Sequence, residues 1–295
     1  MSTLRRQEPV GPGLKRIACD QVESAIRCLT RQAGQSVAAE QAIDQALAVL
    51  ALVEPDLPRP MVRRDRAILA RLRDGLAELA HPVLLAELLG KRYKKTPTDS
   101  ALASAVKTLR KRWASGGKAC SAMSSKAGSF NPAIYRLVAD MAELRGHLGG
   151  WPVDTIANDQ PPRGLRRTYT RARKLANEPM TASALPALTQ TLAELATQLG
   201  VFGKACPTML KAQRKLITRS VDELTSLILN DKLDAALRAE LGKSASKALP
   251  SKKPMAQRAA ACLDSNLDTA LAETPAAFMK RMQAYWAAWR NSKSA

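Results

Sequence analysis

The chain has 295 residues, and its 46 Lys and Arg against 26 Asp and Glu give a formal net charge of +20. A chain of this length buries about three quarters of its unfolded surface, so it needs no disulfides for stability. Its five cysteines are widely spaced and form no Cys-x-x-Cys pair, which excludes a disulfide framework and favours a reducing, cytoplasmic compartment. The charge indicates a polyanionic partner, because such an excess costs self-repulsion in the compact state.

Apolar residues recur every three or four positions along nearly the whole chain, and strand-like alternation with β-branched residues is absent. This periodicity predicts an all-α fold. No uncharged apolar run approaches the ~18 residues of a membrane span, so we expect no transmembrane segment. We expect helices at 13–33, 36–53, 59–80, 82–95, 98–114, 132–148, 162–177, 182–202, 206–229, 231–245, 255–272 and 275–290.

Two stretches rich in loop-forming residues divide this series of helices. Residues 115–132, "SGGKACSAMSSKAGSFNP", and residues 149–162, "GGWPVDTIANDQPP", both have the composition of flexible links. We therefore expect a flexible tail at 1–12 and a first helical half at 13–148, which includes the first link. The second link at 149–162 then joins it to a second helical half at 163–295.

One helix of the second half carries an unusual charge pattern. At about 100° per residue, the six cations from Arg163 to Lys174 share one face of the helix. No acidic residue lies between Arg163 and Glu178 to neutralise them. The opposite arc is uncharged and suits a core, with Leu165, Thr168, Tyr169, Ala172 and Leu175. A solvated face is the simpler interpretation of one basic helix, and a polyanion-binding face is the alternative.

The sequence also repeats itself at a nearly constant offset. "GLKR" at 13–16 returns as "GLRR" at 164–167, "AIDQALAVLA" at 42–51 as "ALTQTLAELA" at 187–196, and "MVRRDRAIL" at 61–69 as "MLKAQRKLI" at 209–217. The common order predicts two similar helical halves. The third pair also repeats one-sided rows of cations, namely Arg59, Arg63, Arg66 and Arg73 in the first half and Lys211, Arg214, Lys215 and Arg219 in the second. Two pseudo-symmetric antiparallel bundles could line a shared basic groove with such rows.

This order of motifs resembles the CHAD domain, an α-helical family of two halves that binds inorganic polyphosphate. The most specific stretch is "WPVDTIANDQPPRGLRRTYTRARKLANEP", which is similar to the loop between the family's halves and the first helix of its second half. "TPAAFMKRMQAYWAAWR" resembles the closing helix and "LALVEPDLPRPMVRRDRAIL" the turn before the third helix. The resemblance implies the two-half fold and polyphosphate as ligand.

The chain departs from the family in the second helix of each half. The family's histidine there is Val37 in the first half and Pro186 in the second, and its basic positions carry Glu40, Gln41, Asp44 and Gln45, then Thr189, Gln190 and Ala193. Residues 32–58 and 175–203 contain no Lys or Arg. This loss favours, as an alternative, a CHAD-like scaffold without polyphosphate binding.

Other chemistry finds little support in the sequence. No phosphate loop, nucleophile elbow or metal-protease helix is present, so we expect no enzyme, no cofactor and no metal site. We assign structural roles to His81 and His147, and we expect Phe278, Met282, Tyr285 and Trp289 to form a core stripe, with Trp286 beside it. "GKRYKK" at 90–95 and "KTLRKRW" at 107–113 are dense basic patches that suit nucleic acid or an anionic surface.

Three hypotheses follow, all without catalysis. The first is a polyanion-binding protein with inorganic polyphosphate in the basic groove. The second is a scaffold that binds a protein or the surface of a storage granule, and the third is non-specific DNA association. The candidate ligand residues are Arg163, Arg166, Arg167, Arg171 and Lys174 first, with Lys15, Arg16, Arg63, Lys211, Arg214 and Lys215 second.

Overall fold

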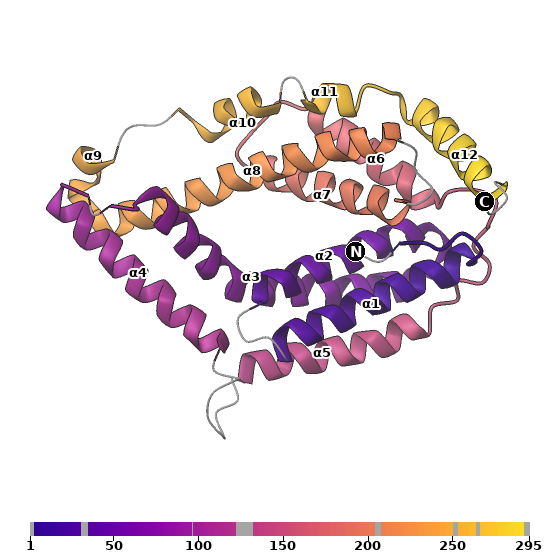
Figure 1. The fold of residues 1–295 in the computed structure, drawn as a ribbon, viewed down its shortest axis with the longest axis horizontal. Helices are drawn as coiled ribbons and strands as arrows, with labels where there is room; N and C mark the ends of the chain where they lie inside the picture. Colours follow the sequence, from indigo (N-terminus) through magenta and orange to yellow (C-terminus); the bar gives the residue numbers. More distant parts are fainter. Residues whose placement is uncertain are drawn as a thin grey trace.

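The computed structural model describes residues 3–30, 35–95, 97–121, 132–203, 208–249, 253–263 and 266–291. Over these residues every regular element is a helix and no strand occurs, so the predicted all-α class is confirmed. The elements before the second expected link are α1 (Val10–Thr30), α2 (Ser36–Val53), η1 (Glu54–Asp56), α3 (Arg59–Arg92), α4 (Ser100–Ser121) and α5 (Pro132–Gly149). Figure 1 shows these helices and those that follow.

The elements after that link begin with the basic helix. They are α6 (Arg163–Asn177), α7 (Leu185–Val201), α8 (Thr208–Leu241), η2 (Gly242–Ser244), α9 (Ala245–Ala248), α10 (Met255–Leu263), α11 (Asn266–Ala270) and α12 (Pro275–Asn291). In Figure 1, α8 begins near α6 and runs to the left end of the molecule, where α4 and α9 lie.

Two expected helix breaks are wrong. α3 continues through Pro82, and α8 continues through Asn230, so each is one helix of 34 residues. A proline inside a helix removes one backbone hydrogen bond and is normally disruptive. Here burial on both sides of the break outweighs this cost, since Leu76 and Leu89 of α3 are both fully buried, in different clusters.

Smaller differences concern the links and the end of the chain. Residues 115–121, expected in a flexible link, form the last part of α4, and the rest of that expectation, at 122–131, lies outside the described residues. The single helix expected at 255–272 is two described helices, α10 and α11.

The described side chains form two apolar clusters of unequal size. The main core takes residues from both expected halves, including α1, α2, α5, α6, α7 and α12. α2 packs against α7, and Gln198 of α7 donates from Nε2 to the carbonyl oxygen of Ala48 at 3.1 Å. The second cluster joins the C-terminal parts of α3 and α8 to α4 and α9. The apolar packing is therefore continuous between the helices of the two halves.

The segment between α5 and α6, expected to be a flexible link, is anchored to the core. Trp151 and Val153 are buried, and the Trp151 indole donates to the buried carboxylate of Asp65 at 2.8 Å. The Asn158 side chain accepts the backbone N–H of Val10 at 2.7 Å. A loop with this many fixed contacts determines where α6 begins.

Residues 3–9, which we expected in a flexible tail, also contact the core. Leu4 is buried, and its backbone N–H donates to Val201 at 3.1 Å. α1 begins at Val10, three residues before the expected start.

In α12 the fully buried residues differ from the expected stripe. Phe278, Met282 and Trp286 are buried, whereas Tyr285 and Trp289 are only partly buried. Trp286 therefore belongs to the core rather than beside it, because the stripe follows positions i, i+4 and i+8.

One described segment, Ser36–Asp56, is long and apolar enough by composition to span a membrane. In this structure 61% of that segment's apolar window is buried inside the protein, as in a core helix.

Candidate functional site: the basic face of α6

α6 has the amphipathic division expected from its sequence. Its outward cations Arg163, Arg166, Arg167, Arg171 and Lys174 are all exposed, whereas Arg173 is partly buried. Its inward residues Leu165, Tyr169 and Ala172 are fully buried. Since one side is held in the core, the charged side cannot rotate away from the solvent.

Tyr169 fixes α6 against α12. Its ring stacks on Phe278 with centroids 4.0 Å apart and planes 4° from parallel, and its hydroxyl donates to the carbonyl oxygen of Glu273 at 3.1 Å. Burial raises the pKa of Tyr169 to about 12, so the phenol stays neutral in physiological conditions.

Gly164 fixes the start of α6 against the end of α2. A Cβ at this position would lie 2.0 Å from the carbonyl oxygen of Ala51 and 2.5 Å from the Cα of Leu52. These are backbone atoms, so only glycine permits this approach. The glycine of the repeated "GLRR" motif therefore sets the position of the cations that follow it.

Arg171 differs from its neighbours because an acidic partner neutralises it. Its guanidinium lies 2.5 Å from the carboxylate of Glu194 on α7. The same carboxylate accepts the Thr168 hydroxyl at 2.9 Å, and the buried Gln198 amide donates to Thr168 at 3.0 Å. Arg171 thus belongs to a polar network at the junction of α6 with α7.

The other cations of the face have fewer partners. Lys174 lies 3.8 Å from Glu178, and both side chains are exposed, so water screens this pair. Among the described residues, no carboxylate lies in ion-pair distance of Arg163, Arg166 or Arg167.

The secondary candidates on α1 and α3 occupy other surroundings. Arg16 is partly buried and bound to Glu8 at 2.7 Å and to Asp20 at 3.3 Å, while the Lys15 ammonium donates to Trp151 O at 3.3 Å. These contacts are internal, so Arg16 is a structural residue in this arrangement. Arg63 of α3 is exposed.

The candidates on α8 form a separate exposed row, with Lys211, Arg214 and Lys215. α6 packs mainly against α7 and α2, whereas α8 packs mainly against α7, α11, α10 and α4. The structure therefore brings the five α6 residues together on one face, and it places the α1, α3 and α8 residues on helices with different neighbours.

α2 carries Glu40 and Asp44 where the family resemblance implied cations, and α7 carries the uncharged Thr189, Gln190 and Ala193. Burial, followed by repulsion from Asp44, raises the pKa of Glu40 on α2 to about 7. Arg73 and Lys232 act against the Glu40 shift.

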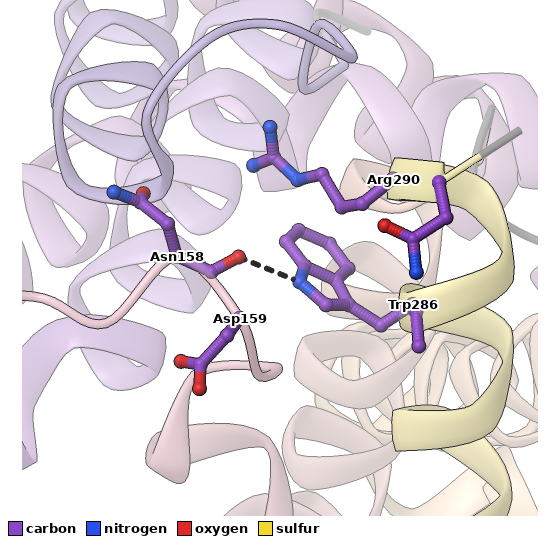
Figure 2. A pocket seen from close by; sticks show the side chains of 6 residues that line it. Asn158, Asp159, Trp286 and Arg290 are labelled. Carbon is purple, nitrogen blue, oxygen red and sulfur yellow. Dashed lines mark hydrogen bonds between the residues drawn. The ribbon is translucent and has the colours of Figure 1, made fainter. Parts of the chain in front are cut away.

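Two surface pockets have linings that include none of the α6 cations. One, with a volume of about 320 Å³, is lined by Pro12, Lys15, Arg16, Cys19, Val153 and Asp154. The other, of about 370 Å³, is shown in Figure 2 and is lined by Asn158, Asp159, Trp286, Ala287, Arg290 and Asn291.

Arg290 in the second pocket is a residue that the sequence reasoning missed. Its guanidinium carbon lies 4.9 Å from the ring centre of Trp286 and 5.1 Å from that of Trp289. It also donates to the carbonyl oxygens of Arg6 and Glu8, the latter at 2.9 Å. Arg290 therefore attaches α12 to the N-terminal segment. In the sequence, the only sign of this role is that Arg290 directly follows the aromatic residues of α12.

Comparison with protein-family models, curated proteins and solved structures found no match for this chain. The resemblance to the CHAD domain therefore depends on the quoted motifs alone.

Proposed function

We propose that this protein binds a polyanion without catalysis, with inorganic polyphosphate as the ligand and the outer face of α6 as the central contact. The observation that carries the proposal is the fixed orientation of this face. Its cations are exposed, and the buried Tyr169 and the close approach of Gly164 hold the helix in place. A row of cations on an ordered helix requires little further ordering to meet a linear polyanion.

The binding chemistry follows from the side chains. The planar guanidinium groups of Arg163, Arg166 and Arg167 suit bidentate contacts with phosphate oxygens, and Lys174 adds a point charge. Displacement of counterions from the ligand supplies much of the free energy, so the affinity falls steeply with salt. Arg171 contributes less than its neighbours, because Glu194 already neutralises it.

The repeated helix order supports a CHAD-like arrangement of two related halves. α3 and α8 have 34 residues each and follow helices of 18 and 17 residues, α2 and α7. In such an arrangement Arg63 and the α8 row of Lys211, Arg214 and Lys215 add outer contacts to the α6 face. Arg16 is omitted from this set because its partners are internal.

The acids of the central helices favour a second candidate function. Glu40 and Asp44 on α2 and Glu194 on α7 oppose a polyanion at the junction of the two halves. If they prevent binding, the chain is a scaffold that contacts a protein or a storage-granule surface instead.

Titration with polyphosphate of defined length at several salt concentrations tests the first candidate. The α6 variant carries Arg163→Gln, Arg166→Gln, Arg167→Gln and Lys174→Gln, and the control removes three exposed cations on other elements, Arg5, Arg71 and Arg136. We expect the α6 variant to lose at least about tenfold in affinity near 0.1 M salt, and its salt slope to flatten by ~0.7–0.9 per lost contact, by analogy with nucleic acids.

Three outcomes contradict the proposal. Equal losses per charge in the α6 variant and the control indicate a diffuse response to net charge. Absence of wild-type binding near physiological salt favours the scaffold. Sustained release of phosphate by the purified protein, with or without Mg²⁺, would show an enzyme. We expect no such release, since no group of three or more His, Cys, Asp or Glu able to hold a metal occurs among the described residues.

A further inference from the structure

The end of the molecule away from α12 forms a second basic surface, which we call the distal lobe. It consists of α3 from residue 85, the described residues between α3 and α4, α4 itself, α8 from residue 233, η2 and α9. Its own apolar cluster includes the buried residues Leu89, Leu109 and Leu237. Figure 1 shows α4 and α9 at the left end of the molecule, while α6 and α12 lie toward the right.

The carboxylates of the distal lobe are mostly engaged inside it. Asp99 accepts the backbone N–H of Leu102 at 2.9 Å, as an N-terminal helix cap does. Asp234 pairs with Arg92 at 2.5 Å, and Glu240 pairs with Arg112 at 2.6 Å. These contacts join α8 to α3 and α4, and Glu87 is the remaining exposed carboxylate among the described residues of the lobe.

More cations than carboxylates of the distal lobe are exposed to solvent. On α4, Lys107 and Lys111 lie on the side opposite the buried Leu109 and Trp113. Beside them, Arg110 donates to the carbonyl oxygen of Tyr93 at 2.5 Å. Among the residues whose side chains the structure describes, the exposed cations of the lobe, apart from Arg110 and Arg112, are Lys91, Lys94, Lys95, Lys107, Lys111, Arg238, Lys243 and Lys247.

Among its described residues, the lobe lacks the exposed aromatic and apolar side chains that hold single-stranded nucleic acid or insert into lipid. Trp113 is 9% exposed, and Tyr93 is partly covered, with the Arg92 guanidinium 5.5 Å from its ring centre. Single-stranded nucleic acids are held by exposed aromatic side chains on which bases stack. Insertion into a lipid surface requires exposed apolar side chains, and among the described residues the large exposed one is Tyr135 of α5.

We infer that the distal lobe binds duplex nucleic acid through its phosphate backbone, without reading the base sequence. Lysines on an ordered helical surface supply phosphate contacts, and these contacts position a duplex without specifying its sequence. The inference is independent of polyphosphate binding on α6, because the two surfaces use different residues.

Fluorescence anisotropy with a labelled DNA duplex of about 25 base pairs, at several salt concentrations, tests the inference. Glutamine replaces the lysines because it removes the charge and retains helix propensity. The lobe variant carries Lys107→Gln, Lys111→Gln, Lys243→Gln and Lys247→Gln, and the matched control is the α6 variant with its four Gln substitutions. For the lobe variant we expect at least about a tenfold loss of affinity near 0.1 M salt and a slope flattened by up to ~0.9 per lost contact.

The control should retain duplex binding within about threefold. Equal losses in the two variants would overturn the inference, and so would tighter binding of a single strand of the same length. Binding of anionic vesicles that the lobe variant abolishes, with no duplex binding by the wild type, would also overturn it. If the lobe variant unfolds at a lower temperature than the wild type, two double variants replace it, Lys107→Gln with Lys111→Gln and Lys243→Gln with Lys247→Gln. Each should show about half of the change in the slope of log affinity against log salt concentration.

Discussion

Replacing Gly164 by alanine should destabilise the protein, although glycine to alanine inside a helix normally stabilises it by about 0.8–1 kcal/mol. The new Cβ would lie 2.0 Å from Ala51 O and 2.5 Å from Leu52 O. Contacts below 3.0 Å are essentially absent around real Cβ atoms, so α6 must move away from α2 by about 1 Å. Overpacking of this kind costs roughly 1–3 kcal/mol and sometimes more. Because the clash involves backbone on both sides, we expect about 3 kcal/mol.

Thermal unfolding followed by circular dichroism measures this effect. For a chain of this size 1 kcal/mol corresponds to about 2 °C in Tm, so Gly164→Ala should lower the Tm by about 6 °C. The matched control is Gly146→Ala in α5, where an added Cβ meets nothing within 4 Å. This control should raise the Tm by about 1–2 °C, since it gains helix propensity without a clash. A Tm of Gly164→Ala at or above the wild-type value would refute the close approach of α6 to α2, and with it the fixed position of the basic face.

Two further predictions concern Arg290 and the partly buried carboxyl group of Glu40 on α2. Arg290→Ala should lower the stability by about 2–3 kcal/mol, because it removes two hydrogen bonds and the stacking on two indoles; denaturant titration should show no comparable loss for Lys280→Ala on the exposed side of α12. The folded-state pKa of Glu40, about 7, lies above its ordinary value of 4.5, so the contribution of this carboxyl to stability should be fully present below pH 4.5 and lost as the pH rises from 4.5 to 7. Glu40→Gln should flatten this part of the Tm-against-pH profile, and an unchanged profile would contradict the raised pKa.

The helical class and the charged face of α6 can both be predicted from the amino-acid sequence alone. Both follow from periodicity, which depends only on the geometry of one helix. The spacing of Leu165, Thr168, Tyr169 and Ala172 identifies the buried side of α6, and the cations between them occupy the other side whichever core receives the helix. The loss of cations from 32–58 and 175–203 likewise fits α2 and α7, two mainly buried helices that pack together.

Tertiary structure decided which of these charges are free and which segments are ordered. Arg171 and Arg16 look like equivalent cations in the sequence, yet Glu194 and Glu8 neutralise them in the fold. Pro82 looks like a helix break, and the loop around Trp151 looks like a flexible link. In each case the deciding partner comes from another element of the fold, and local patterns carry no information on such partners. The free energy gained by burial against such partners is larger than the differences in helix propensity. A buried large side chain contributes about 1.5–3 kcal/mol, whereas most propensities differ by less than about 1 kcal/mol.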